Sequence, residues 1–289
     1  AAAAGAPQTR ARPTGRLAAA ALSPGRLNAE AENNATVDEY VADIREQLLR
    51  REAAGMSRPD YMEAQAQLTG KMRGILVDWL VDVHARYRMR PETLFLTVNI
   101  IDRYLSRAPV ERSQLQLVGV VALFIAAKFE EIDPPTAESM AYITDNTYAE
   151  CEIFEMECDM LTALDFHILV PTAATFLEAT DFGPDGATLR ELARYLLELG
   201  LLELRMNRYE PSQLAAAAAE LGGELLGRPP AARGQRRGYP PPKEECMEGL
   251  RELHGAAGKG ALKAVYHKYA HSQHLRVARR TLAANSSSA

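Results

Sequence analysis

Three histidines and a run of carboxylates are the side chains whose types and spacing come nearest to chemistry. His267, His271 and His274 fall at i, i+4 and i+7 of an expected helix, a spacing that could hold zinc. Five acidic residues between positions 150 and 159 could suggest acid catalysis, but they are spread around an expected helix, which is more typical of a solvated face. Neither pattern is specific, so we expect no metal, no cofactor and no catalytic residues in this chain.

Four further charges lie on faces that are otherwise apolar. Lys128 continues the apolar stripe of its expected helix, and Glu157 lies within the stripe of another. A charge in such a place is costly unless it is paired, so these two residues are candidates for an interface. The alternative is that Lys128 reaches water from the end of its helix while Glu157 caps neighbouring backbone. Arg73 and Asp102 pose the same question inside two strongly hydrophobic helices, where a pair would be structural.

The segment 71–89 is an expected helix with more apolar positions than one core face requires. One stripe at i, i+3, i+4 and i+7 consists of Met72, Ile75, Leu76 and Trp79. Most of the remaining circumference is apolar too, at Val77, Leu80, Val81 and Val83. An ordinary surface helix carries a single apolar stripe of roughly 100°. Either this helix is buried all round, or one face packs inward and another binds a partner, which favours binding over catalysis.

From residue 37 onward the pattern is almost wholly helical, with no strand-like alternation over a useful length. A short amphipathic helix ends near Gly55, and five more are expected at 71–89, 91–106, 113–130, 135–143 and 147–164. Ser113 and Thr147 are the expected N-caps. A break at Pro171 precedes a second set of similar spacing, at 172–181, 187–206, 211–226, 243–256 and 260–271. The sequence therefore predicts an all-α protein with two helical modules.

Composition limits the classes of protein to be considered. A hydrophobic content of 47% and a charged content of 25% are typical of a globular protein, and the net charge of −5 gives no reason to expect nucleic acid. The longest apolar run, 117–127, is shorter than the roughly 20 residues that cross a membrane. The three cysteines are too few for a disulfide framework and are expected to be reduced thiols. We expect neither nucleic acid nor a membrane as a partner.

Both ends of the chain have compositions that cannot form a core. Residues 1–36 are rich in alanine, and the four arginines among the first 29 residues are accompanied by no acid, which predicts disorder. A transit peptide is the alternative for this segment. Because the sequence starts with Ala1, the chain could be a fragment. Residues 281–289 are expected to be a tail, and the Arg- and Pro-rich stretch 228–242 a solvated loop.

Six motifs in order resemble the cyclin family, in particular its mitotic A- and B-type members. They are MRGILVDWL, VNIIDRYLS, LQLVG, AAKFEEIDPP, YITDNTY and the Pro171-Thr172 pair, and the resemblance covers roughly residues 37–275. It implies two five-helix cyclin folds in tandem: residues 37–170 would contain a short N-terminal helix and the first fold, and residues 171–280 the second. The chain departs from the family pattern at Gly74, where an alanine is usual, and at Gly222-Gly223, where a helix former is expected.

The resemblance also implies a function. The chain would be a regulatory subunit that activates a cyclin-dependent serine/threonine kinase as a heterodimer, controlling cell division at mitosis in the nucleus and cytoplasm. The family's kinase contacts map to Lys128, Glu157, Phe129, Phe166, Tyr40 and Ile44, and its internal ion pair maps to Arg73 and Asp102. The alternatives are a DNA-binding transcription factor of the related fold, which the negative charge disfavours, and a scaffold without kinase activation, which Lys128 and Glu157 disfavour. The choice between A-type and B-type stays open.

The same resemblance gives the spare apolar stripe of segment 71–89 a role. In the family, a shallow groove binds Arg-x-Leu peptides of substrates and inhibitors, and its counterparts here are Met72, Ile75, Leu76, Trp79, Asp82, Leu115 and Gln116. Asp82 would meet the basic residue of the peptide. The alternative is that these residues only pack against the N-terminal segment. No destruction-type Arg-x-x-Leu element occurs in residues 1–36.

Overall fold

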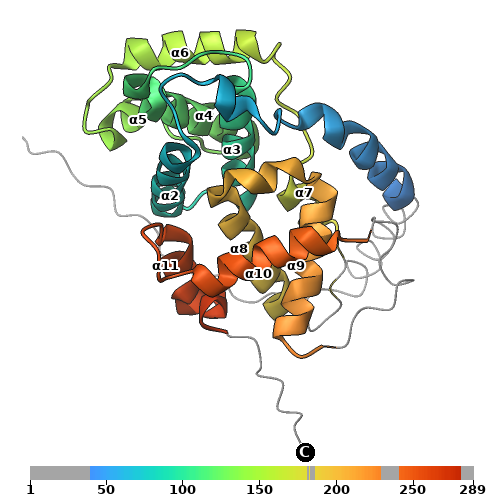
Figure 1. The fold of residues 1–289 in the computed structure, drawn as a ribbon. Helices are drawn as coiled ribbons and strands as arrows, with labels where there is room; N and C mark the ends of the chain where they lie inside the picture. The colour runs from blue at the N-terminus through green and yellow to red at the C-terminus, as the bar shows by residue number, and fades with distance from the viewer. Residues whose placement is uncertain (1–39, 181, 183–185, 229–240, 281–289) are drawn as a thin grey trace, which may run out of the picture. The chain divides into compact units, whose positions relative to one another are not determined.

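The computed structural model describes residues 40–180, 182, 186–228 and 241–280. The expectations for residues 1–36, for most of the loop 228–242 and for the tail lie outside the described residues. Residues 40–45 are helical and belong to a unit of their own, in which Tyr40 and Ile44 are exposed. The chain from Glu46 onward forms a second unit, which contains both helical modules (Figure 1).

The first module packs four helices around one buried helix. Helix α4 (Leu115–Glu130) is buried at every position from Leu117 to Ala127. It contacts α2 (Gly70–Tyr87), α3 (Pro91–Leu105), α5 (Ala137–Ile143) and α6 (Glu150–Ala163). Gly119 lets α2 approach α4, because a Cβ atom there would lie only 2.7 Å from Leu76 Cδ1. Short 3₁₀ turns precede α2 and α4, at Ala53–Gly55, Tyr61–Ala64 and Arg112–Gln114.

One helix in the described part of the chain, Arg112–Glu130, is long and apolar enough to cross a membrane by length and composition. The buried share of its apolar window is 67%. The core helix of a globular protein passes the same test, and α4 is buried at the centre of its module. Its apolar character is therefore explained by packing within the fold.

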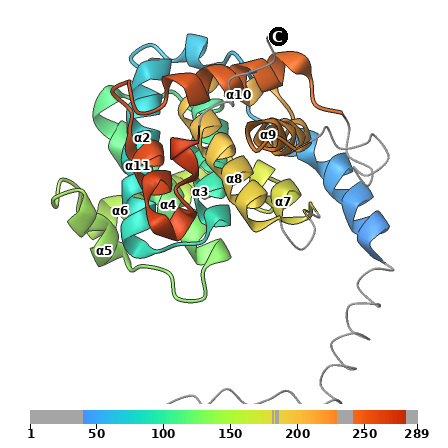
Figure 2. The ribbon, with the colours of Figure 1, turned by 90° about the horizontal axis from the view of Figure 1, so that it is seen from below.

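The second module repeats this plan around α8 (Ala187–Leu202). This helix contacts α7 (Ala173–Glu178), α9 (Pro211–Leu225), α10 (Glu244–Ala256) and α11 (Ala264–Ala270), as Figures 1 and 2 show. The 3₁₀ turns of this module are η4 (Leu204–Arg208), η5 (Ser272–His274) and η6 (Val277–Arg279). The residues that the structure describes contain no strand, which confirms the all-α class and the tandem of two five-helix modules.

The double glycine in the second module does not interrupt its helix. α9 continues through Gly222 and Gly223 to Leu225. A Cβ atom at position 222 would lie 2.9 Å from Leu189 Cδ1, so this glycine lets α8 and α9 pack closely, whereas a Cβ atom at 223 would meet nothing within 4 Å. Gly222 therefore has a packing role at a position where a helix former was expected.

Several helices begin later than expected, among them α4, α6 and α11, which starts at Ala264. A 3₁₀ turn occupies residues 112–114, so α4 starts beyond it and Ser113 is not its N-cap. α6 starts at Glu150, and Thr147 donates its hydroxyl to the Thr144 carbonyl at 2.6 Å instead of capping the helix. Both expected N-caps were wrong, because short local turns precede these helices and hydrophobic periodicity does not reveal them.

The three histidines considered for zinc do not share a helix. α11 ends at Ala270, so His271 and His274 lie beyond it. His274 lies 2.5 Å from a carboxylate oxygen of Glu191 and packs its ring against Tyr269 at 4.6 Å between centroids. The helical spacing that suggested zinc was therefore wrong. The part of the chain that the structure describes contains no group of three or more side chains arranged to hold a metal.

Helix α2 is shared between both modules, which accounts for its surplus of apolar positions. Leu76, Leu80 and Val83 belong to the core of the first module. Val81 belongs to the core of the second, where α2 lies beside α8 and α11 (Figure 2). Burial all round is wrong, because Ile75 is 52% exposed. The apolar residues outside the first stripe are divided between the two cores, and Val81 is the one that packs in this chain's own second module.

Candidate functional site

Lys128 and Glu157, the two charges on apolar stripes, form an ion pair with each other. Lys128 lies in the last turn of α4, and Glu157 lies midway along α6, which packs against α4. The Lys128 side chain is 40% exposed and that of Glu157 is 11% exposed. The Lys128 ammonium also lies 4.1 Å from the centroid of the Phe124 ring, a cation–π contact. Pairing offsets the cost of these charges and leaves the lysine accessible from outside.

Exposed apolar side chains surround this ion pair. Phe129 follows Lys128 and is 47% exposed, and Ile132 is fully exposed just beyond α4. Phe154 of α6 is 48% exposed and packs against Phe124 at 6.3 Å between ring centroids. The α4–α6 face is defined by Lys128, Phe129, Ile132, Phe154 and Glu157. Bulky apolar groups around a partly accessible ion pair are typical of a surface that binds a partner protein.

A turn with left-handed backbone follows α6 and presents Phe166. Asp165 and Phe166 both have positive φ, 53° and 56°, a conformation that is costly for residues other than glycine. Two arginines of the α3 region hold the turn: Arg103 donates to the His167 carbonyl at 2.8 Å, and Arg107 donates to the Asp165 carboxylate at 2.9 Å. Phe166 is 69% exposed. The anchored turn therefore keeps an aromatic ring in contact with solvent.

The seven residues expected to bind Arg-x-Leu peptides, here called the docking patch, lie on α2 and at the start of α4. Ile75 is 52% exposed, and Met72 and Trp79 are half-buried against the first core. Leu76 and Leu115 are buried, with exposures of 6% and 7%, so they support the patch from below. The remaining members are the exposed Asp82 and the half-buried Gln116.

Arg73 and Asp102 form a buried ion pair at the centre of a larger network. Arg73 Nε and Nη2 donate to the two Asp102 carboxylate oxygens at 2.8 and 2.7 Å. Tyr61 and Asn207 each donate to the same carboxylate at 2.6 Å, and Arg73 Nη1 donates to the Leu201 carbonyl at 2.5 Å. Burial alone would lower the pKa of Arg73, but the charge of Asp102 raises it above its ordinary value. One carboxylate thus joins α2, α3 and the second module.

Two more carboxylates bind helix N-termini of the second module. Glu52 is 4% exposed and accepts hydrogen bonds from the N–H and the hydroxyl of Ser212, both at 2.9 Å, in the first turn of α9. Asp78 of α2 accepts a hydrogen bond from the Ala264 N–H at 3.0 Å, at the first residue of α11. Burial raises the pKa of both carboxyl groups. Both contacts satisfy free backbone N–H groups and fix the second module against segments that precede it.

Sequence reasoning missed several residues of these sites. Phe154 and Ile132 are large apolar side chains among acidic neighbours, outside any apolar stripe, and that pattern could have identified them. Tyr61 and Asn207 carry no comparable signal, because both lie far from Asp102 in the sequence. Tyr61 is 41 positions from Asp102, and Asn207 is 105 positions from it. Such contacts depend on the tertiary fold.

Two family models match the chain. The model of the cyclin N-terminal domain matches residues 43–169, and the model of the cyclin C-terminal domain matches residues 162–282. Between them they cover both five-helix modules, and they overlap at residues 162–169, from the end of α6 into the segment before α7.

Curated relatives match over much of this chain. The G2/mitotic-specific cyclin cdc13 of Schizosaccharomyces pombe is 47% identical over 197 residues, which are 67% of this chain and 40% of that protein. Cyclin-B of Marthasterias glacialis is 44% identical over 68% of this chain and 50% of its own length. Cyclin-A3-2 of Arabidopsis thaliana is 39% identical over 80% of this chain and 66% of its own length. The chain spans about half the length of the curated relatives it matches.

Solved structures share the fold at low identity. A viral cyclin from herpesvirus saimiri has a TM-score of 0.56 and 20% identity, covering 82% of this chain and 93% of that one. A chain of the yeast RNA Pol II CTD kinase CTDK-1 complex has a TM-score of 0.54 and 14% identity, covering 70% and 73%. These likenesses show the fold. Because both family domains match in order and relatives are 39–47% identical, this chain belongs to the cyclin family and is similar to its A- and B-type members.

Proposed function

We propose that this chain is the regulatory subunit of a cyclin-dependent serine/threonine kinase, which it binds through the α4–α6 face and Phe166. The observation that carries the proposal is the Lys128–Glu157 ion pair, which is partly accessible among exposed aromatic and aliphatic side chains. Similarity to relatives named G2/mitotic cyclins supports it. In this proposal the kinase supplies all catalytic groups.

The α4–α6 face and Phe166 together offer two kinds of contact. Lys128 has three N–H donors, so the ion pair with Glu157 leaves donors for backbone carbonyl groups of the kinase. The exposed rings of Phe129, Phe154 and Phe166 supply apolar area, worth roughly 25 cal/mol per Å² buried before the entropic costs of association are subtracted. The ion pair thus contributes specificity, and the rings contribute most of the affinity.

Activation is allosteric in this proposal. An active kinase needs its αC glutamate paired with the ATP-binding lysine and its activation loop in place. A bound protein can favour that state only if it binds that state more tightly than the inactive one. The α4–α6 face therefore contacts the αC helix more extensively in its inward position than in its outward position.

The docking patch recruits substrates and inhibitors that carry Arg-x-Leu. Its rim of Met72, Ile75 and Trp79 offers apolar contact to the leucine, and Asp82 offers a carboxylate to the arginine. The patch includes the first residues of α4, whereas the α4–α6 face includes its last turn. Kinase and substrate can therefore be held at opposite ends of one rigid helix.

The double variant Lys128→Ala/Glu157→Ala tests the proposal. We expect it to lower the activation of a cyclin-dependent kinase on a histone-type substrate by at least about tenfold, because it truncates the centre of the interface. The variant should keep the circular dichroism spectrum and melting temperature of a folded chain. The matched control is Glu224→Ala/Arg251→Ala, which removes an ion pair of 3.0 Å in the second module and should leave activation unchanged.

Two results would contradict the proposal. One is an unchanged activation constant for the folded double variant. The other is a wild-type complex that forms without raising kinase activity, which would support the scaffold alternative.

A further inference from the structure

The chain contains Arg-x-Leu sequences of its own, and Arg-x-Leu is the motif that the docking patch is proposed to bind. Four of the five lie inside helices, at 103–105 in α3, 190–192 and 194–196 in α8, and 251–253 in α10. The leucines of the first three are at most 2% exposed, and Leu253 packs against the core of the second module. In the folded chain these four sequences are therefore not available as extended peptides.

The fifth sequence, Arg280-Thr281-Leu282, begins at the last residue that the structure describes. Arg280 is exposed and has an extended backbone, with φ −79° and ψ 128°. The guanidinium groups of Arg279 and Arg280 form no ion pair with any described residue. His254 of α10 donates to the Arg280 carbonyl at 2.9 Å, which holds the start of the motif at the surface. Thr281 and Leu282 lie outside the described residues.

The docking patch has groups that complement this sequence. Ile75 is 52% exposed on its rim, next to the half-buried Met72 and Trp79 on the same helix. Asp82, one turn along α2 from Trp79, is exposed, and its carboxylate forms no ion pair within the described part of the chain. The patch therefore offers apolar contact to a leucine and an unpaired carboxylate to an unpaired arginine.

We propose that the docking patch also binds the Arg280-Thr281-Leu282 segment of a second copy of this chain. The inference rests on the proposed function and adds a partner to the same surface. Within one copy, Arg280 is bonded to α10 and not to Asp82, so docking there would first break the bond from His254. Docking on a second copy needs no such rearrangement, because the segment and the patch are both exposed at the surface.

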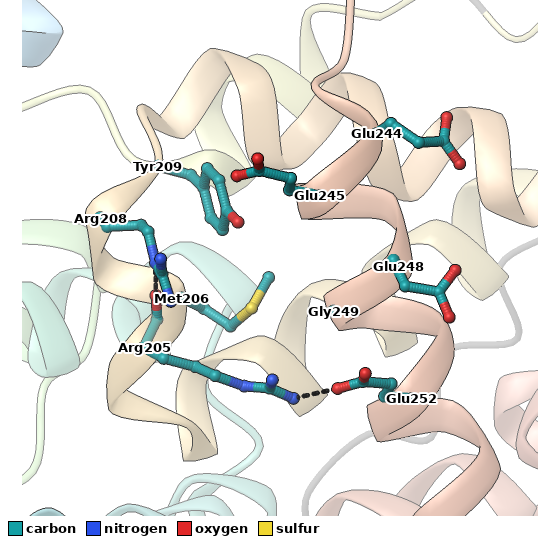
Figure 3. Close-up of a pocket in the computed structure, with 9 residues that line it drawn as sticks. All are labelled: Arg205, Met206, Arg208, Tyr209, Glu244, Glu245, Glu248, Gly249 and Glu252. Carbon is teal, nitrogen blue, oxygen red and sulfur yellow. Dashed lines mark hydrogen bonds and ion pairs between the residues drawn. The ribbon is translucent and has the colours of Figure 1, made fainter.

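A different acidic surface, on α10 itself, fits the segment less well. It is a pocket of about 430 Å³ between η4 and α10, lined by four glutamates and two arginines, and Arg205 pairs with Glu252 there at 2.7 Å (Figure 3). Its apolar residues Met206 and Tyr209 are buried, with exposures of 2% and 7%, so they offer little surface to a leucine. The docking patch instead combines the exposed Ile75 with an unpaired carboxylate.

Association of this kind is heterologous, because the patch of one copy binds the segment of the next and leaves a free patch and a free segment at the two ends. Self-association therefore continues beyond a dimer as the concentration rises. We expect a dissociation constant between about 10 µM and about 1 mM, because few residues make contact. An occupied patch is closed to substrates, so concentrated chains compete with their own Arg-x-Leu substrates.

The first test measures the mass of the full chain by sedimentation velocity at rising concentration. We expect Ile75→Ala and Leu282→Ala each to weaken self-association by at least about tenfold. An equal mixture of the two variants should form dimers, because one keeps the segment and the other keeps the patch. Leu275→Ala, which truncates another exposed leucine near the segment, is the matched control and should associate like the wild type.

The second test separates this inference from the docking role itself. Two labelled peptides are titrated with the Leu282→Ala chain: VARRTLAANS, which is the sequence of residues 277–286, and an Arg-x-Leu peptide with unrelated flanking residues. We expect both to bind, and both to bind at least about tenfold more weakly when Ile75→Ala is added.

The outcomes that overturn the inference differ from those that overturn the docking role. The inference fails and the docking role stands if only the unrelated peptide binds, or if the mixed variants stay monomeric while that peptide binds. Both fail if neither peptide binds. A monomeric wild-type chain that binds the peptides at least about tenfold more weakly than Leu282→Ala would place the segment on the patch of its own chain, and it would overturn the second copy as the occupant.

Discussion

Buried charges in this chain are held by opposite charges and by neutral donors together. Arg73 is fully buried against Asp102, and Tyr61 adds a neutral hydrogen bond. Glu198 is fully buried as well, with Lys268 and the Tyr269 hydroxyl each 2.7 Å from one carboxylate oxygen. Removal of one partner from such a pair leaves a charge in the core with no compensation. Loss of a charged partner should therefore cost much more than loss of a neutral one.

Asp102→Asn isolates that difference, because it removes the charge and keeps the shape of the side chain. We expect the free energy of unfolding to fall by about 3–5 kcal/mol, since Arg73 stays buried without a counter-charge. Asn207→Ala deletes one neutral donor to the same carboxylate and should cost only about 1 kcal/mol. Urea denaturation at neutral pH measures both. Equal losses in the two variants would show that the charge is not what stabilises the network.

Periodicity alone could identify individual charged residues but not their partners, and the pairing of Arg73 with Asp102 was expected only through the resemblance to the cyclin family. Periodicity identified Lys128, Glu157, Arg73 and Asp102 as charges on apolar faces, and the structure pairs them two by two. The two members of each pair are 29 positions apart in the sequence, so no spacing rule within one helix could identify them as partners. The neutral donors around Asp102 were beyond prediction for the same reason.

At the scale of elements, α2 serves two cores and one surface. Gly74, the departure from the family motif, lies where α2 meets the second module: a Cβ atom there would lie 3.0 Å from the Leu202 carbonyl and 3.3 Å from Leu262 Cδ1. The substitution of glycine for alanine therefore affects the contact between modules. The docking patch is unaffected, because Ile75 and Met72 lie on other faces and remain accessible.

Ile75 is the member of the patch that can be changed with least effect on the fold, because it is 52% exposed. We expect Ile75→Ala to raise the KM of an Arg-x-Leu substrate by roughly tenfold through the loss of apolar contact with the leucine. Phosphorylation of a peptide without the motif should not change. Leu275→Ala, at 48% exposure in the second module, is the matched control. An equal loss on both substrates would argue against a docking role.

The helices themselves were the most predictable part of the fold. All ten helices of the two modules occur where the apolar period of 3.6 residues predicts them, because each has a face in a core. Their ends were less predictable. Local turns delay the starts of α4 and α6, and α11 ends before His271. Hydrophobic periodicity does not predict these ends, because they are set by backbone and side-chain hydrogen bonds.

At the scale of the whole second unit, the two modules are joined by apolar and polar contacts alike. Val81 of α2 and Leu94 and Phe95 of α3 belong to the core of the second module. The bonds of Glu52 and Asp78 to helix N-termini cross the same boundary. Neither module could separate without exposing apolar side chains and leaving buried polar groups unpaired, so the modules should unfold together.

Trp79 is the sole tryptophan of the chain and reports on the first module, whereas far-UV circular dichroism reports on the helices of both. We expect the urea transitions of the two signals to share one midpoint, because the modules form one cooperative unit. Glu52→Ala should shift both midpoints downward together, through the loss of the Ser212 hydrogen bonds. A tryptophan transition clearly separated from the circular dichroism transition would show that the modules are independent.

The shared carboxylate of Asp102 also limits how hybrid proteins can be built from this fold. A chimera that joined residues 40–170 to the C-terminal module of another cyclin would keep Asp102 and Arg73, but it would take the residue at position 207 from the graft. An apolar residue there would leave a buried carboxylate oxygen with one hydrogen bond fewer than in this chain. Grafts with a hydrogen-bond donor in the side chain at position 207 are therefore the ones to choose first. Exchange of modules then depends on keeping the hydrogen bond to Asp102 at the boundary between them.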